Sequence, residues 1–164
     1  MSILGLDPGS AIVGYALLEK KDKKLFSLKY GCITTDSRQP ASRRLVQIER
    51  ELAKIVKKYH PQEAVVEKLF FFKNLKTAIA VSQARGVILA TLERVGLKTF
   101  EYTPLQVKLS VTGYGKAPKI QVQRMVKNIL NLREIPRPDD AADALAIAIC
   151  HSYQLKIKSA KLKV

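Results

Sequence analysis

The chain has no tryptophan and only two cysteines and two histidines among its 164 residues. Cys32 and Cys150 lack the paired spacing of a zinc site, and both are predicted to be small buried apolar residues. His60 stands just before a helix-ending proline, and His151 stands near the end of the last predicted helix. Both histidines are predicted to be structural or exposed. This scarcity argues against a zinc finger and against a nucleophile activated by histidine.

Long hydrophobic runs are also missing. No apolar run reaches the roughly 18 residues that a membrane span needs. The segment Met1–Asp7 lacks the basic start and the cleavable apolar stretch of a signal peptide. The sequence therefore predicts a cytoplasmic protein with no membrane contact. Its length predicts one domain over residues 1–153, followed by a basic C-terminal tail over residues 154–164 that we expect to be flexible.

Acidic residues are scarce, because 14 Asp and Glu stand against 29 Lys and Arg, for a formal net charge of +15. A surface of that sign attracts a polyanion, and nucleic acid is the commonest polyanion inside cells. A lysine-rich thermophilic surface is the alternative, but that composition usually adds glutamate as well. The charge predicts nucleic-acid binding without separating DNA from RNA.

The hydrophobic pattern predicts an α/β fold, with a mixed sheet flanked by helices. Alternating runs near the start predict three antiparallel strands, and later segments alternate between strand and helix. Strands are expected at 3–7, 12–18, 25–33, 64–67 and 99–102, and helices at 42–59, 74–95, 104–110, 121–130 and from 139 or 140 to about 153. Either Asp139 or Asp140 is expected to cap the last helix.

The few acids stand at informative places. Asp7 and Glu67 each end an apolar strand, where a buried carboxylate is costly unless its charge is compensated. Asp140 and Asp143 open the last helix and lie three residues apart, so they share one face. Strand ends and a helix N-terminus can converge at one edge of a sheet. Carboxylates gathered there would suit Mg²⁺ or Mn²⁺, and a pair of such ions can drive phosphodiester hydrolysis.

Each acid also has an ordinary explanation. Asp7 could simply form a turn, and Glu67 could pair with a neighbouring lysine. Asp140 could be only a helix cap, and Asp143 could be a surface residue of the helix. Asp139 competes with Asp140 for the same position, and periodicity does not choose between them. The hypothesis of a metal site rests on the four acids taken together in a strongly basic chain.

Several spaced motifs occur in order along the chain. They are Ile3–Ser10 with Gly14 and Tyr15, Glu67 with Phe70 and Asn74, Gln83–Gly86, Gln106–Lys108 with Gly113, Lys119 and Gln121–Gln123, and Asp140–Ala148. Together they resemble the motifs of RuvC-type crossover junction endonucleases. The resemblance runs from residue 3 to about residue 152 and is specific because many motifs agree in order.

The resemblance implies an RNase H-like fold with a five-stranded sheet, and a homodimer whose two active sites face one four-way (Holliday) junction. Symmetric, metal-dependent cuts in two strands of like polarity would resolve the junction in homologous recombination and DNA repair. The resemblance also implies that Asp7, Glu67, Asp140 and Asp143 bind Mg²⁺, with Mn²⁺ as a substitute and two ions in each site. This assignment selects Asp140 over Asp139. A branch-migration motor is implied as a partner.

The same resemblance implies that Lys108 and Lys119 are basic residues at the scissile phosphate, where they would offset transition-state charge. Lys116, Lys73 and Arg85 are candidate DNA contacts, and so is Asn74. The alternative for Lys108 and Lys119 is a plain phosphate contact or a solvated lysine. The alternative for Arg85 is a role within its helix or at an interface.

The segment Phe70–Phe72 has three aromatic residues in a row, which cannot all face one core. The resemblance implies that Phe70 stacks on bases at the junction centre, a contact that contributes roughly 1–3 kcal/mol per base. Packing in the core or at the dimer interface is the alternative. The chain departs from the family motif at Lys68, Leu69, Phe71 and Phe72, so the sequence leaves open which of the three aromatics would stack.

Three other functions fit parts of the sequence. A nuclease of the same fold that acts on RNA would share the opening motif, but the stretch from Gln106 to Lys119 and the aromatic segment argue against it. A sugar-kinase-like ATPase would need two lobes, for which 164 residues are too few. A non-catalytic junction-binding protein would keep the lysines but would not need four placed acids.

Overall fold

The computed structural model describes residues 1–22, 24–69 and 75–161, and within them all side chains except those of residues 75–76 and 155–161. The predicted DNA contacts Phe70, Lys73 and Asn74, together with Phe71 and Phe72, lie outside the described residues. The elements are β1 (Ser2–Asp7), β2 (Ile12–Lys21), β3 (Lys24–Thr34), α1 (Ala41–Tyr59), β4 (Glu63–Glu67), α2 (Leu75–Arg94), β5 (Thr99–Tyr102), α3 (Pro104–Thr112), α4 (Lys119–Ile129) and α5 (Asp139–Lys161). The predicted mixed five-stranded sheet flanked by helices is confirmed.

The sheet has the strand order β3-β2-β1-β4-β5. The first three strands form the predicted antiparallel meander, and β4 and β5 continue the sheet in parallel with β1. Leu6 of β1 lies opposite Val66 of β4. Because the two strands are parallel and each ends one residue later, Asp7 and Glu67 reach the same edge of the sheet.

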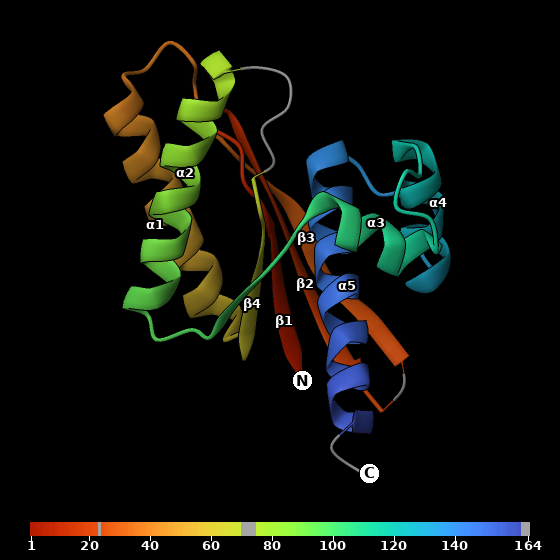
Figure 1. Ribbon diagram of the computed structural model, residues 1–164. Coiled ribbons are helices and arrows are strands. Elements are labelled where there is room, and N and C mark those ends of the chain that lie inside the picture. Colours follow the sequence, from red (N-terminus) through yellow and green to blue (C-terminus); the bar gives the residue numbers. More distant parts are fainter. Residues whose placement is uncertain (23, 70–74, 162–164) are drawn as a thin grey trace.

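Helices cover both faces of the sheet (Figure 1). One face packs against α1 and α2 and buries Leu4, Leu6 and Val66. The other face packs against α3, α4 and α5 and buries Ile3 and Val65. Side chains alternate between the faces of a strand, so Asp7 and Glu67 lie on the face that α5 covers.

Two glycines let α5 approach the sheet closely. A Cβ on Gly5 would collide with the backbone of Ala144, and a Cβ on Gly14 would collide with the backbone of Asp140. Glycine is the residue that admits such a close approach of two backbones. The N-terminal turn of α5 therefore lies directly against β1 and β2, next to the sheet edge where Asp7 stands.

Several helix boundaries differ from the sequence predictions, among them the start of α4 and the end of α5. Helix α4 begins at Lys119 rather than at Gln121, because the carbonyl of Pro118 accepts hydrogen bonds from the amides of Gln121 and Val122. Helix α5 continues to Lys161, so the predicted end near residue 153 is wrong. The sequence from 139 onward contains no glycine or proline that would stop the helix. The division into residues 1–153 and a tail remains a prediction.

Helix α5 starts at Asp139, as expected, but the prediction that Asp139 or Asp140 caps it is wrong. Asp139 and Asp140 lie inside its first turn, and the carbonyl of Pro138 accepts the hydrogen bonds from Ala141 and Ala142 that begin the helix. Neither aspartate is therefore needed outside the helix as a cap. No helix among the described residues is long and apolar enough to cross a membrane.

Candidate metal centre

The structure brings the four predicted acids together at one edge of the sheet. Asp7 and Glu67 stand at the ends of β1 and β4, and Asp140 and Asp143 stand in the first turns of α5. The acids of the strands and the acids of α5 interact electrostatically, because the charge of Asp143 raises the pKa of both Asp7 and Glu67. The convergence expected from strand ends and a helix N-terminus is therefore present.

Burial and the neighbouring acids disfavour the charged forms of two of these carboxyl groups. Burial raises the pKa of Asp7 to about 8, and the charges of Glu67, Asp143 and Asp140 add to the rise, while Lys119 opposes it. Burial also raises the pKa of Glu67 to about 7, with a further contribution from Asp143. A buried group of like charges is stabilised by a bound cation or by protons. The cluster thus has the electrostatics of a cation site.

Lysines from two helices face this cluster. Glu67, Asp143, Lys108 and Lys119 line one small cavity of about 160 Å³, beneath α3 and α4. Lys108 and Lys119 both lower the pKa of Glu67. Helix α3 is fixed at its start by a capping box between Thr103 and Gln106, two residues before Lys108. Both predicted basic residues therefore lie near the acids, although half of the Lys119 side chain is exposed to solvent.

Lys119 contacts two acids at once. Its Nζ lies 2.9 Å from Oδ2 of Asp143 and 3.5 Å from Oδ2 of Asp139. Burial raises the pKa of Asp143, and the hydrogen bond from Lys119 opposes the rise. The buried Gln123 donates from Nε2 to Oδ1 of Asp139 at 3.0 Å. In the sequence Asp139 stands only as a rival of Asp140, and Gln123 stands in a motif without an assigned role. A polar residue between the buried Val122 and Val126 of α4 was the available signal.

The donor set fits a hard divalent cation, since four carboxylates offer only oxygen ligands. Among the residues that the structure describes, no three of the candidate side chains stand in position to hold an ion as they are now oriented. The ammonium group of Lys119 lies against Asp143 instead. Ion binding by Asp143 would require release of its oxygen from Lys119.

The remaining predicted site residues have different surroundings. Arg85 is half-buried in α2, where Nε donates to the carbonyl oxygen of Glu67 at 3.3 Å and the guanidinium pairs with Glu101. Lys116 is exposed in the turn between α3 and α4. The structure thus places Arg85 beside the acid-bearing strand and Lys116 at the rim of the lysine-bearing helices.

The histidines play no part in the cluster. His60 is exposed and ends α1 with a left-handed backbone, φ 45°. His151 is buried on α5, where Nε2 lies 2.8 Å from Glu63 and Nδ1 lies 3.0 Å from the hydroxyl of Tyr102. The predicted structural or exposed roles are confirmed. Cys150 is buried as expected, whereas Cys32 is half-buried.

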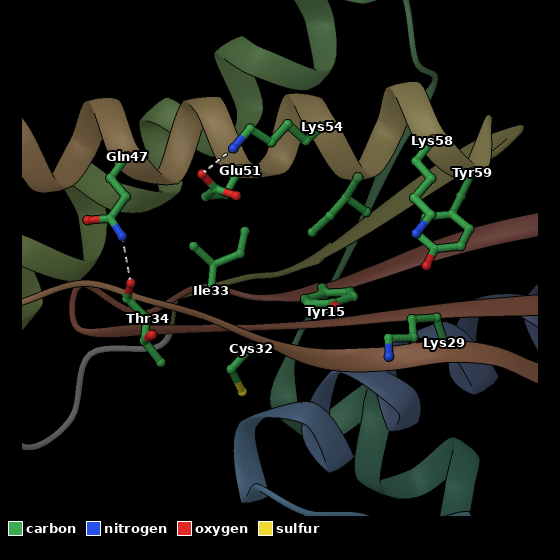
Figure 2. Close-up of a pocket in the computed structure, with 11 residues that line it drawn as sticks. Tyr15, Lys29, Cys32, Ile33, Thr34, Gln47, Glu51, Lys54, Lys58 and Tyr59 are labelled. Atoms are coloured by element: carbon green, nitrogen blue, oxygen red, sulfur yellow. Dashed lines mark hydrogen bonds and ion pairs between the residues drawn. The ribbon is translucent and has the colours of Figure 1, made fainter.

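A second hollow lies between α1 and the strands β2 and β3 and is separate from the acid cluster (Figure 2). It measures about 440 Å³ and is lined by Tyr15, Lys29, Lys58 and Tyr59, among other residues, but by none of the four acids. The side chain of Cys32 points away from α1 in this view (Figure 2). The hollow offers no carboxylate set for a metal, because its one acid, Glu51, is hydrogen-bonded to Lys54.

The fold and the site together define a class. A mixed five-stranded sheet with acids at two strand ends, two more acids on a covering helix and lysines facing them is the arrangement of a metal-dependent nuclease of the RNase H-like fold. Comparison with known proteins identifies the family. The model of the family "Crossover junction endodeoxyribonuclease RuvC" matches residues 3–151, and the chain belongs to this family.

Curated relatives agree over nearly the whole length. The RuvC crossover junction endodeoxyribonuclease of Halothermothrix orenii is 59% identical over 160 residues, which cover 96% of this chain and 97% of that protein. The RuvC protein of Clostridioides difficile is 51% identical over 158 residues, which cover 96% of this chain and 94% of that protein. The RuvC family consists of metal-dependent nucleases.

Solved structures agree with the fold. Thermus thermophilus RuvC in complex with a Holliday junction substrate has a TM-score of 0.90 and 33% identity, and the match covers 96% of each chain. The yeast mitochondrial Holliday junction resolvase has a TM-score of 0.63 at 15% identity, with 94% of this chain and 81% of that chain covered. The second likeness supports the RNase H-like fold alone.

Proposed function

We propose that this chain cuts four-way DNA junctions in homologous recombination and DNA repair, by symmetric hydrolysis of two strands of like polarity. The observation that carries the proposal is the cluster of four partly buried acids, near Lys108 and Lys119, in a chain with a net charge of +15. Membership of the RuvC family and the junction bound by the Thermus protein support the substrate. The chain is proposed to act in the cytoplasm, where its DNA substrate would lie.

Asp7, Glu67, Asp140 and Asp143 are proposed to hold Mg²⁺, with Mn²⁺ as a substitute and two ions in each site. Such ions supply an activated water and stabilise the leaving oxygen of the phosphodiester. The acids must lose their protons to serve as ligands, and the raised pKa of Asp7, about 8, and of Glu67, about 7, makes this loss part of ion binding. The apolar lining from Val107, Val122 and Ala146 limits water around the carboxylates of Glu67 and Asp143.

Lys108 and Lys119 are proposed to stabilise negative charge on the phosphate during cleavage. Lys108 and Lys119 line the same cavity as Glu67 and Asp143. A phosphate attracted by cations bound to the acids would therefore lie close to both lysines. Asp139 keeps Lys119 beside the site through an ion pair that does not use the metal ligands. The lysine therefore remains in place when Asp143 turns to an ion.

Further DNA contacts are proposed at Phe70, Lys73, Asn74 and Lys116. Lys116 is exposed next to the cavity-lining helices, as a phosphate contact would require. The other three lie outside the described residues and are proposed from the family motif that includes Glu67. Stacking by Phe70 on junction bases remains a prediction from the family motif, as does the alternative that Phe71 or Phe72 stacks.

A homodimer is proposed because two strands must be cut in a coordinated way. Helix α2 offers a suitable surface, since Ile79 is 68% exposed there and Gly86 has open space around its Cα. A two-fold dimer uses the same surface on both subunits, and a helix with a small residue at its centre permits close approach. A branch-migration motor as partner is proposed from the family resemblance alone.

The deciding experiment compares an end-labelled four-way junction with a linear duplex of the same sequence, in Mg²⁺ and in EDTA. We expect paired nicks at symmetric positions in the junction, only with the metal, and none in the duplex. Asp7→Asn should bind the junction but not cut it. Junction binding without cutting by the native chain in Mg²⁺ or Mn²⁺ would favour a purely architectural role, and equal cutting of RNA would contradict the DNA substrate.

A further inference from the structure

Arg85 lies behind the strand end that carries Glu67. It projects from α2, whose neighbouring residues Ala84 and Ile88 are buried on the α1 and α2 face of the sheet. Its side chain is 20% exposed; Nε donates to the carbonyl oxygen of Glu67 at 3.3 Å, and the guanidinium pairs with the carboxylate of Glu101. One side chain therefore joins three elements, α2, β4 and β5.

The two faces of the sheet separate this arginine from the acid cluster. Glu101 lies opposite Val66 in the sheet register and shares the face that α2 covers. The carboxylate of Glu67 lies on the other face, with Asp143. Arg85 thus bonds to the backbone of Glu67 on the α2 face of the sheet, while the carboxylate of Glu67 lies on the α5 face. Directly after Glu67, the amide of Lys68 donates a hydrogen bond to the carbonyl of Tyr102 in β5 at 2.8 Å.

We propose that Arg85 and Glu101 form a positioning pair that fixes the end of β4 to α2 and so sets the carboxylate of Glu67 for ion binding. The proposal rests on the proposed function in one respect, that Glu67 is a metal ligand. Arginine suits the role because its planar fork reaches two acceptors in different directions, whereas the lysine ammonium is a single point charge. Through α2 the pair also connects the proposed dimer surface to the metal centre. It is an alternative to the DNA contact predicted for Arg85.

The test compares Arg85→Met and Glu101→Gln with a matched control, Arg94→Met. Arg94 lies on the same helix and pairs with Glu49, but it is 69% exposed and makes no bond to β4. Mn²⁺ binding to the DNA-free protein is measured by electron paramagnetic resonance of the free ion, which requires no cutting activity. We expect Arg85→Met to weaken Mn²⁺ binding by about tenfold, the lower end for residues that support metal ligands. Glu101→Gln should act in the same direction, and Arg94→Met should leave the affinity unchanged.

Salt dependence separates the positioning role from a phosphate contact. Junction binding is measured without divalent metal over a range of salt concentrations. Loss of a phosphate contact lowers the slope of log K against log salt by about one, whereas loss of a positioning pair leaves the slope unchanged. A lowered slope for Arg85→Met, together with native Mn²⁺ affinity, would overturn the proposal.

Two further variants keep the result decisive. Arg85→Lys preserves the charge but not the fork, so we expect it to retain the Mn²⁺ defect; native affinity in this variant would contradict the role of the fork. If circular dichroism shows that Arg85→Met is unfolded, the comparison of Glu101→Gln with Arg94→Met decides instead. Native Mn²⁺ affinity in Glu101→Gln would then overturn the pair. A native protein that binds Mn²⁺ but cuts no junction would contradict the proposed function, while the Mn²⁺ comparison would still test the pair.

Discussion

The two glutamates of β4 stand on one face of one strand, yet their surroundings differ completely. Glu63, at the start of the strand, lies 2.8 Å from Nε2 of the buried His151 and 3.9 Å from Nζ of Lys98. Glu67, at the end, lies among other acids, and its pKa rises to about 7 because of burial and Asp143. The protein itself supplies partners for the first acid. Around the second, burial and a neighbouring acid outweigh the nearby Lys108 and Lys119, and this difference supports a structural role for Glu63 and the proposed metal-binding role for Glu67.

Exchanging each glutamate for glutamine should produce the largest contrast in activity. Glu67→Gln removes a proposed ligand, so we expect junction cleavage to fall by about a hundredfold or more, the scale on which transition-state charge stabilisation is lost. Glu63→Gln changes no group at the cluster, and its single-turnover rate should stay near that of the native chain. Single-turnover cleavage at saturating Mg²⁺ measures both. Equal losses in the two variants would show that the strand, rather than the position along it, matters.

The cluster of four acids should also make the metal-free protein less stable at high pH. The folded-state pKa values of Asp7 and Glu67, about 8 and about 7, lie above their ordinary values, so the folded state binds more protons than the unfolded state at pH 5–7. The free energy of unfolding should therefore fall as pH rises through this range and level off above pH 8. A slope of at least about 1 kcal/mol per pH unit is expected.

Urea unfolding in EDTA from pH 5 to pH 9 measures this slope. Mg²⁺ should flatten the profile, because a bound cation takes the place of the protons. Asp7→Asn should flatten it in EDTA as well, since one of the two titrating groups is gone. A profile that is level across the range in EDTA would contradict the electrostatics described for the cluster.

The glutamate at the other end should instead matter for stability. Glu63→Gln weakens the hydrogen bond to His151, which is buried and also bonded to Tyr102. We expect the free energy of unfolding to fall by roughly 1–3 kcal/mol, the cost of leaving a buried polar group poorly paired. Glu67→Gln should raise it at pH 8, because like-charge repulsion is relieved. Chemical denaturation of both variants in EDTA at that pH tests the opposite signs.

Much of this contrast is visible in the sequence, and some of it is not. An acid that ends a buried apolar strand is anomalous by itself, so the sequence alone singles out Asp7 and Glu67, and the alternation of strands and helices predicts the sheet. The partners of Glu63 and Glu67 could not be predicted. His151 lies 88 residues from Glu63, and Arg85 lies on the helix that follows β4; local patterns carry no information about either contact. The motifs accordingly predict a DNA contact for Arg85, whereas its guanidinium contacts Glu67 and Glu101.

Helix ends show the same division between local and tertiary causes. The end of α2 near Gly96 followed from local chemistry, since Gly96 adopts φ 68°. The start of α4 could not be predicted in this way. The apolar pattern gives no boundary at Lys119 or Ile120, and the hydrogen bonds that begin the helix go to the carbonyl of Pro118. This shift of two residues places Lys119 in the first turn of α4, facing Asp139 and Asp143.

The smallest expected effect concerns the hold of Asp139 on Lys119. Asp139 is exposed, and Lys119 is half-exposed, so their ion pair should contribute about 0.2–1 kcal/mol. Asp139→Asn should therefore slow single-turnover cleavage by roughly two- to fivefold, far less than Lys119→Met, which removes the proposed phosphate contact itself. Glu134→Gln, in the loop before α5, gives a control for the loss of one negative charge near that helix. If Asp139→Asn matched Lys119→Met, the small contribution expected of this ion pair would be wrong, because loss of Asp139 would then be equivalent to loss of Lys119.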